Sequence, residues 1–250
     1  MEARRSKRLI VVGAATGIGA AGANLMRRAD WQIALIDRNA QGMAESASAC
    51  EAATTAVADV TDENSLKDAV ARCVTSLGGV DAVWSNVGVQ TSGDIGRTSV
   101  EEFDLAWAIN VRAHFIVAKT VIPELRKMGG GSILITASNA GLQTEEAMVA
   151  YSTTKAAAIQ LTRLLARDCA KDGIRVNALC PGYVDTPFNA PVWESFGGRD
   201  SFLAGVGTTV PLGRISTPEE AATHVRFLLS DDASFVTGQS FVADGGELVA

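Results

Sequence analysis

Short apolar runs alternate with helical patterns along the chain, and this alternation restricts the fold more than any other feature of the sequence. Runs typical of buried strands cover residues 9–12, 32–36, 55–60, 80–84, 132–137, 174–179 and 240–243. The main helical patterns cover residues 20–28, 65–77, 100–128 (with Pro123 near a bend) and 151–171. Strands that alternate with helices pair in parallel. The sequence therefore predicts an α/β protein, a single domain over residues 1–250 with a doubly wound parallel seven-stranded sheet and helices on both faces.

The composition supports one well-packed domain. Of 250 residues, 47% are hydrophobic and 20% are charged, which is typical of a chain with a full core. The net charge is −6, and no basic block extends beyond Arg4, Arg5, Lys7 and Arg8, which argues against nucleic-acid binding. No apolar run reaches the ~18 residues of a membrane span. We expect a soluble, cytoplasmic protein.

The cysteines and histidines do not indicate a metal site. Cys50, Cys73, Cys169 and Cys180 are widely spaced, and the chain has only two histidines. No zinc-binding pattern fits these spacings, so we predict no metal. We expect the cysteines to act as small buried hydrophobic residues in a reducing compartment.

A glycine-rich turn joins the first strand to the first helix. Gly13, Gly17 and Gly19 follow the run 9–12, and the second strand ends in Asp37. Glycines let the backbone approach a pyrophosphate, and the N-terminus of the helix offers free N–H groups and a partial positive charge. An acid at the end of the second strand can accept hydrogen bonds from an adenosine ribose, and it repels a 2′-phosphate. The arrangement predicts a Rossmann-type site that prefers NAD to NADP.

A hydroxyl, a phenol and an ammonium group follow the fifth strand. Ser138 comes directly after the run 132–137, and Tyr151 and Lys155 lie one helical turn apart in the next helix. All three are expected at the carboxyl edge of the sheet, where open α/β folds bind ligands. A cation beside a phenol favours the phenolate, so the tyrosine can exchange a proton with an alcohol while the serine hydrogen-bonds the same oxygen. Tyr-x-x-x-Lys also occurs as an ordinary surface pair, so the pattern needs support from the rest of the chain.

A long segment, residues 183–217, lies between the sixth strand and the last helix. Its aromatic residues and glycines are unlike an ordinary connection, and we expect it to contain a substrate lid. A peripheral helix pair that merely covers the sheet is the alternative. From this segment Arg199 or Arg214 could reach the site to pair with a carboxylate.

Together these residues resemble the short-chain dehydrogenase/reductase family over nearly the whole chain, from Leu9 to Gly246. The matching landmarks are Gly13, Gly17 and Gly19; Asp59-Val60; Asn110; Ser138, Tyr151 and Lys155; Pro181-Gly182 with Val184 and Thr186; and Asp244-Gly245-Gly246. Two positions depart from the family's pattern. Val12 replaces a threonine whose hydroxyl usually braces the cofactor loop, and Val87 adds bulk in the segment 85–88.

The resemblance implies a role for each matching residue. Tyr151 would be the general acid/base, and Lys155 would lower its pKa and bind the nicotinamide ribose. Ser138 would orient the substrate oxygen, and Asn110 would hold a water that relays protons. The residues expected to bind the cofactor, NAD, are Gly13, Thr16, Gly17, Ile18, Gly19, Asp37, Arg38, Asp59, Val60, Asn86, Gly88, Tyr151, Lys155, Pro181, Gly182, Val184 and Thr186. Those expected to contact the substrate are Ser138, Gln143, Tyr151, Tyr183 and Trp193. The family's usual packing of its two long helices implies a homotetramer.

The leading function is an NAD(H)-dependent oxidoreductase that interconverts a secondary alcohol and a ketone, both small molecules. A 3-oxoacyl-carrier-protein reductase that uses NADPH shares these motifs, but Asp37 and the acidic balance count against it. Arg38, next in the chain, leaves the use of NADP open. A sugar or cis-diol dehydrogenase is a further alternative. A non-catalytic NAD-binding sensor would be expected to lack one of the four catalytic residues, all of which are present.

Overall fold

The computed structural model describes residues 5–250, which form one sheet of seven parallel strands in the order β3-β2-β1-β4-β5-β6-β7. The strands are β1 Arg8–Val12, β2 Gln32–Asp37, β3 Thr54–Val57, β4 Ala82–Ser85, β5 Gly131–Thr136, β6 Ile174–Pro181 and β7 Ser240–Ala243. The strand order reverses direction at β1, between β2 and β4. The predicted fold class is confirmed, and the reversal places a ligand crevice at the carboxyl ends of β1 and β4.

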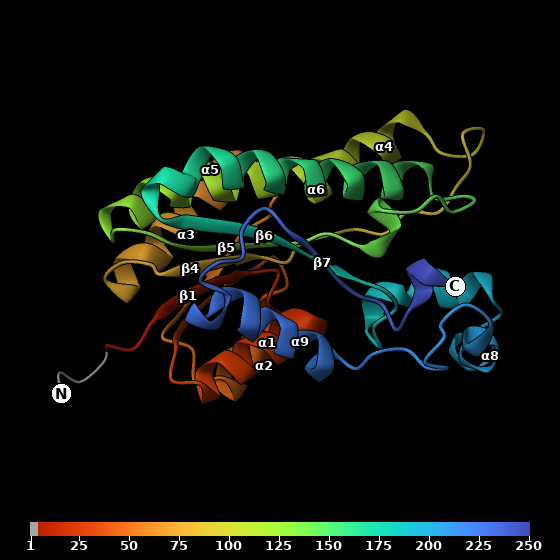
Figure 1. The fold of residues 1–250 in the computed structure, drawn as a ribbon, viewed down its shortest axis with the longest axis horizontal. Coiled ribbons are helices and arrows are strands. Elements are labelled where there is room, and N and C mark those ends of the chain that lie inside the picture. Colours follow the sequence, from red (N-terminus) through yellow and green to blue (C-terminus); the bar gives the residue numbers. More distant parts are fainter. Residues whose placement is uncertain (1–4) are drawn as a thin grey trace.

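Helices cover both faces of the sheet (Figure 1). One layer contains α1 Gly17–Arg28, α2 Ala40–Ala49 and α9 Pro218–Leu229, and the other contains α3 Glu63–Leu77, α4 Val100–Trp107, α5 Ala113–Lys127 and α6 Val149–Cys169. Alternation along β1 explains the two cores: Leu9 and Val11 pack towards α1 and α9, whereas Ile10 and Val12 pack towards α3, α5 and α6. Buried strands with two apolar faces are typical of a parallel sheet.

A π-helical turn, Ala108–Arg112, joins α4 to α5 into one continuous helix. The helix was predicted over 100–128 with Pro123 near a bend, but Pro123 lies inside α5 and the irregular turn lies at Asn110 instead. By length and composition this helix is the one segment of residues 5–250 that could cross a membrane. Its most apolar stretch has a mean hydropathy of 1.3, and 56% of that stretch is buried in the protein. The sequence does not indicate such a segment, because Arg112 and Lys119 interrupt the apolar run.

β3 and α2 depart most from what the sequence predicts. β3 ends at Val57 rather than at residue 60, because Asp59 Oδ1 accepts hydrogen bonds from Thr61 N (2.9 Å) and Thr61 Oγ1 (2.8 Å), which form a turn instead of a strand ladder. α2 was not predicted from the sequence. Its only buried side chains are Met43 and Ser46, so it lacks a clear apolar stripe, and its start depends on Asn39 capping Gly42 N at 3.0 Å.

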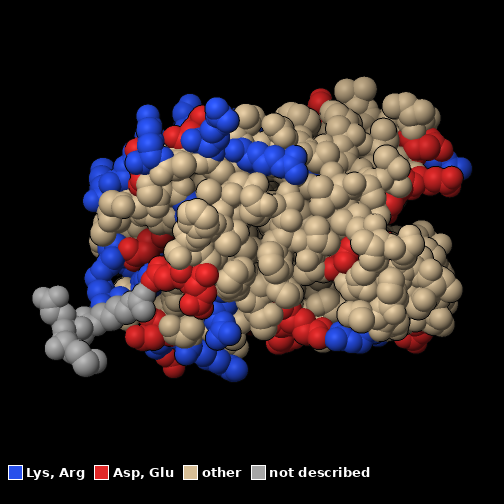
Figure 2. All heavy atoms as spheres, in the orientation of Figure 1, with Lys and Arg blue, Asp and Glu red and all other residues tan. Residues whose placement is uncertain are grey.

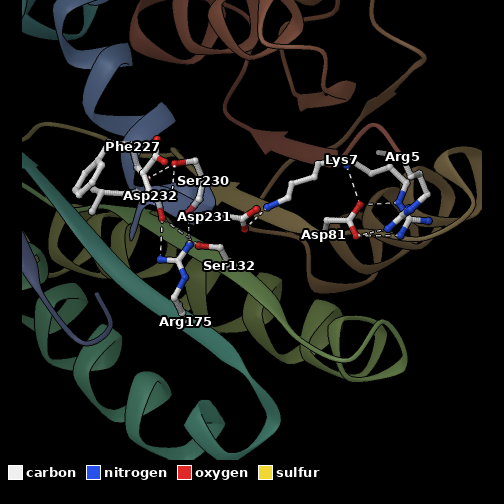
Figure 3. Close-up of polar contacts among 11 residues, drawn as sticks. Arg5, Lys7, Asp81, Ser132, Arg175, Phe227, Ser230, Asp231 and Asp232 are labelled. Atoms are coloured by element: carbon white, nitrogen blue, oxygen red, sulfur yellow. Dashed lines mark hydrogen bonds and ion pairs between the residues drawn. The ribbon is translucent and has the colours of Figure 1, made fainter. Parts of the chain in front are cut away.

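The basic residues near the start of the chain form ion pairs at the amino edge of the sheet (Figure 3). Arg5 Nη2 lies 2.7 Å from Asp81 Oδ1, and Arg8 Nε lies 2.8 Å from Asp81 Oδ2. Lys7 pairs with Asp231. Arg4 lies outside the described residues. This edge is opposite to the carboxyl edge, so the basic segment takes part in the fold and not in the predicted site.

Beyond β6 the chain forms α7 Ala190–Ser195 and α8 Arg199–Gly205, which lie apart from the helical layers at the carboxyl end of the sheet (Figure 1). These helices have a small apolar cluster of their own, formed by Val192, Phe202, Val206 and Val210. The predicted segment 183–217 is therefore an ordered unit beside the site.

Candidate active site

A cavity of about 280 Å³ opens at the carboxyl ends of the strands. Every residue predicted to bind the cofactor lines it except Gly19. Of the residues predicted to contact the substrate, Ser138, Tyr151 and Tyr183 line the cavity, but Gln143 and Trp193 do not. Figure 2 shows a hollow at this end of the molecule, between the parts that carry α4 and α8, with acidic side chains at its margins. Most Lys and Arg side chains on this face gather at the opposite end.

The glycine turn lines the cavity as a cradle, and its glycines pack too closely against neighbouring atoms to carry side chains. Gly13 and Gly17 have φ angles of 85° and 58°, which favour glycine. A Cβ on Gly13 would lie 2.9 Å from the Asn86 carbonyl carbon, and a Cβ on Gly19 would lie 2.0 Å from Gly13 O. Gly19 therefore does not line the cavity but lets α1 pack against the turn. The open cradle at the N-terminus of α1 fits the diphosphate of a nicotinamide dinucleotide.

A chain of hydrogen bonds braces this turn from β4 and β5. Trp84 Nε1 donates to Thr136 Oγ1 (2.9 Å), which in turn donates to Asn86 Oδ1 (2.8 Å). Asn86 Nδ2 donates to Gly13 O at 2.9 Å. The hydroxyl that Val12 lacks is thus replaced by bonds from neighbouring strands, and the turn is held without it.

Asp37 lies in the cavity wall at the end of β2. Its Oδ2 accepts a hydrogen bond from Ala15 N at 3.0 Å, and its Oδ1 accepts one from Asn39 N at 2.9 Å. Each carboxylate oxygen keeps a further lone pair that can accept from a ribose hydroxyl. Arg38 and Asp59 line the same end of the cavity. This end suits the adenosine part of a dinucleotide.

Ser138, Tyr151 and Lys155 meet at the other end. Ser138 follows β5, and the two other residues lie on α6, with Lys155 Nζ 5.6 Å from the centre of the Tyr151 ring. Lys155 Nζ donates to Thr136 O at 3.1 Å, and a Cβ on Gly88 would lie 3.3 Å from it. Glycine at position 88 therefore makes room for the ammonium group.

Burial is the largest influence on the pKa values of Tyr151 and Lys155. It raises the pKa of Tyr151, and the hydrogen bond to Ser138 only partly opposes the rise. Burial also lowers the pKa of Lys155 to about 8. Desolvation is thus the dominant influence on both groups in the chain by itself. The effect of the lysine on the tyrosine pKa stays a prediction.

Asn110 is fully buried in the π-helical turn. Its Oδ1 accepts from Val89 N (2.8 Å), and its Nδ2 donates to Val89 O (2.9 Å) and to Thr154 Oγ1 (3.0 Å). The side chain thus ties the cavity loop after β4 to α6. π-Helical turns inside α-helices are frequent at functional sites.

The polar residues near the site that the sequence analysis did not identify include His114 and Glu247. His114 is fully buried, its Nδ1 lies 2.6 Å from Ser85 Oγ, and burial, with the nearby Lys155 charge, lowers its pKa to about 3. The imidazole is therefore neutral. Glu247 lines the cavity from the end of the chain. The only sequence signal for it is its place directly after Asp244-Gly245-Gly246.

The arginines of the 183–217 segment are engaged in ion pairs. Arg199 Nη2 lies 2.5 Å from Asp185 Oδ2, and its guanidinium lies 5.8 Å from the centre of the Trp193 ring. Arg214 Nη2 lies 2.7 Å from Glu220 Oε1. Neither arginine lines the cavity, so neither provides the counter-ion for an anionic substrate that the sequence left open. Among residues 5–250 no cluster of metal-binding side chains occurs.

The chain is similar to known oxidoreductases along its whole length. The family model described as enoyl-(acyl carrier protein) reductase matches residues 13–247. A 2,5-dichloro-2,5-cyclohexadiene-1,4-diol dehydrogenase of Sphingobium indicum is 36% identical, with 96% of each chain covered. A 2-(R)-hydroxypropyl-CoM dehydrogenase of Xanthobacter autotrophicus is 34% identical, with 96% of this chain and 98% of that protein covered. A 3-oxoacyl-[acyl-carrier-protein] reductase of Thermotoga maritima is 30% identical, with 96% of this chain and 97% of that protein covered.

Solved structures agree with these relatives. Levodione reductase superposes with a TM-score of 0.94 at 28% identity, covering 98% of this chain and all of that one. An actinorhodin polyketide ketoreductase variant with NADPH superposes with a TM-score of 0.94 at 27% identity, covering both chains fully. The family model, the relatives and the shared architecture establish that this chain belongs to the short-chain dehydrogenase/reductase family of oxidoreductases, which use a nicotinamide cofactor.

Proposed function

We propose that this protein is an NAD(H)-dependent oxidoreductase that interconverts a secondary alcohol and a ketone. The observation that carries the proposal is the meeting of Ser138, Tyr151 and Lys155 in one cavity with the glycine cradle. The dehydrogenases among the relatives support this class of reaction. Fold alone would not suffice, because function depends on the residues of the site.

Each residue of the trio has a distinct task in this proposal. A bound nicotinamide supplies the carbon that gives or takes the hydride. Ser138 Oγ hydrogen-bonds the substrate oxygen and fixes its position. Tyr151 Oη donates the proton that this oxygen gains in ketone reduction, and burial favours the protonated phenol that this step needs. In the direction of alcohol oxidation the phenol must first lose its proton, and the Lys155 ammonium stabilises the resulting phenolate.

Asn110 contributes by position. Its side chain holds Val89 and Thr154, so the cavity loop and α6 keep a constant distance. We assign it the relay of protons between Lys155 and solvent through a water. The pKa of Lys155, about 8, suits a group that exchanges protons near neutral pH.

We propose NAD as the preferred cofactor because the Asp37 carboxylate repels a 2′-phosphate. Arg38 at the same end of the cavity is the one feature that would favour NADP. The actinorhodin ketoreductase with NADPH illustrates that cofactor in a related structure. For this reason the cofactor is tested directly below.

The test is a screen at 340 nm with NAD and NADP separately, against secondary alcohols, cis-diols, sugars and 3-oxoacyl thioesters. We expect turnover with NAD and a neutral alcohol, and loss of at least ~10³-fold in kcat for Tyr151→Phe, since the acid/base is removed. Cofactor binding measured by fluorescence serves as the control for folding of the variant. Full activity of Tyr151→Phe would refute the mechanism, and turnover only with NADPH and 3-oxoacyl thioesters would refute the cofactor and substrate assignment.

A 3-oxoacyl-carrier-protein reductase is the second candidate, supported by the Thermotoga maritima relative. A carrier protein is acidic and needs a basic surface beside the cavity. Acidic side chains instead border the hollow in Figure 2, which favours a small neutral substrate.

We further propose that residues 183–217 act as a substrate lid and that the protein is a homotetramer. Phe188 of this segment lines the cavity and contacts the Tyr151 ring, with 6.3 Å between ring centres.

Large apolar side chains exposed on α4, α5 and α6 support self-association: Leu105, Trp107, Phe115 and Leu164. Sedimentation equilibrium at micromolar concentration should show a tetramer, and a monomer alone would contradict it. The free, buried cysteines agree with our expectation that the protein acts in the reducing cytoplasm.

A further inference from the structure

The end of the chain folds back over the cavity. Gly245 and Gly246 have φ angles of 69° and 94°, a pair of left-handed residues that turns the backbone. Asp244 holds this turn by accepting hydrogen bonds from Gly246 N and Leu248 N, each at 2.9 Å. As a result the side chain of Glu247 lies in the cavity wall.

Neutral amides hold the Glu247 carboxyl group in place. Asn139 Nδ2 donates to Oε2 at 2.8 Å, and Gln143 Nε2 lies 3.5 Å from Oε1. The same Gln143 amide donates to Glu145 Oε1 at 2.8 Å. Glu145 also lines the cavity, so two carboxyl groups face it and share one amide outside it. A Cβ at Gly182 would lie 2.9 Å from Glu247 Oε2, so glycine opposite the carboxyl group makes room for it.

Among residues 5–250 no lysine or arginine forms an ion pair with Glu145 or Glu247 in the cavity wall. The cations that line the cavity are Arg38, at the adenosine end, and Lys155, which donates to Thr136 O. The arginines of the neighbouring segment are held in ion pairs of their own. The wall therefore offers hydrogen-bond acceptors and negative charge without a counter-ion.

The groups that face Glu247 keep it near its titration point. Burial raises the pKa of its carboxyl group to about 7, and the charges of Glu145 and Asp244 add to the rise, whereas the amides of Asn139 and Gln143 lower it. Tyr183, from the segment after β6, is the other titratable neighbour, and burial raises its pKa to about 12. The phenol is therefore neutral, and Glu247 is mostly charged at pH 8.

We propose that Glu145 and Glu247 select the substrate: they accept a hydrogen bond from a second hydroxyl group of a neutral diol and exclude alcohols that carry a carboxylate, sulfonate or phosphate. The inference rests on the proposed function, since it concerns the substrate of the same cavity. A carboxylate only accepts hydrogen bonds, so it pairs with a hydroxyl group and repels another anion. Rejection by an unpaired like charge is a strong source of specificity in a water-poor site.

The test compares two probes on one carbon skeleton, cis-cyclohexane-1,2-diol and cis-2-hydroxycyclohexane-1-carboxylate. Binding to the full-length protein saturated with NAD is measured by calorimetry at pH 8. We expect the wild type to bind the diol at least ~10-fold more tightly than the carboxylate, and Glu247→Gln to lower this ratio below ~3. Glu145→Gln, the second variant, should lower it in the same direction. Glu146→Gln is the matched control, because Glu146 is exposed and does not line the cavity; it should retain the wild-type ratio.

Repeating the binding measurement at a second pH distinguishes the effect of the Glu247 charge from that of the side chain's shape. At pH 6 Glu247 is mostly protonated, so the ratio of the wild type should fall towards that of Glu247→Gln, which should itself change little. Equal binding of both probes by the wild type, binding of neither, or an unchanged ratio in both glutamine variants overturns the inference. Turnover is followed at 340 nm in the same samples. Discrimination that is lost in Glu247→Gln without turnover of any alcohol would support the inference and refute the proposed oxidation.

Discussion

Replacing Asn110 by leucine tests how a single buried side chain holds the cavity together. Leucine has the same number of side-chain heavy atoms with the same branching, so the change removes hydrogen bonds without opening a cavity. Three bonds disappear: two to the backbone of Val89 and one to Thr154 Oγ1. Thr154 Oγ1 keeps its own bond to Tyr151 O at 2.8 Å, so the main loss falls on the N–H and C=O groups of Val89.

The expected cost follows from these two backbone groups. A buried polar group that loses its partner costs ~1–3 kcal/mol. Two such groups, reduced because Val89 is only partly buried, predict that Asn110→Leu lowers the free energy of unfolding by about 3–4 kcal/mol. Thr154→Val removes only one of the three bonds and should cost about 1–2 kcal/mol. Because Val89 lines the cavity, the Michaelis constant for the cofactor should also rise in Asn110→Leu.

Urea unfolding followed by tryptophan fluorescence measures both variants at one fixed protein concentration, since the stability of an associating protein depends on its concentration. The double variant should be less destabilised than the sum of the single ones, since the bond between Asn110 and Thr154 is counted in both. A loss below ~1 kcal/mol for Asn110→Leu would mean that the loop does not depend on this side chain. The structural role given to the π-helical turn would then be refuted.

Further predictions concern the cofactor and the response to pH. Asp37→Ser should raise kcat/KM for NADPH relative to NADH by ~10²-fold, because a like charge near the 2′-phosphate is worth a few kcal/mol; an unchanged ratio at 340 nm would count against the NAD assignment. The folded state keeps His114 neutral down to about pH 3, whereas the unfolded chain takes up a proton near pH 6.5. This group should therefore lower the free energy of unfolding by ~1.4 kcal/mol per pH unit below pH 6.5. Stability curves of the wild type and His114→Leu should diverge in that range, and parallel curves would contradict the assignment.

Local patterns were enough to locate most of the fold. All seven strands were predicted, and β7 has the predicted bounds, because apolar runs of this kind depend only on neighbouring residues. α6 ends at Cys169, close to the predicted end at residue 171, and a left-handed Gly173 (φ 69°) closes the turn that follows the helix. α2 was not predicted because its buried face is small. β3 is shorter than predicted because the turn formed by the Asp59 side chain competes with the hydrogen bonds between strands.

For the site as well, some positions followed from local patterns and others did not. Tyr151 and Lys155 lie one turn apart on a helix, and Ser138 lies two residues beyond the end of β5, so their meeting follows from local geometry and the parallel sheet. Gln143 and Trp193 were predicted to contact the substrate, but neither lines the cavity. Trp193 packs instead beside the cluster of α7 and α8, with the Arg199 guanidinium over its ring.

The sequence by itself determined the α/β class, the glycine turn and the candidate trio of Ser138, Tyr151 and Lys155, because each depends on residue types at short, regular spacing. Only the tertiary structure decided which side chains share the cavity and how they are charged. Glu247 reaches Asn139 from the far end of the chain, and His114 is neutral because the surrounding layers exclude water. Burial and long-range contact arise from how the layers pack, and no local pattern encodes them.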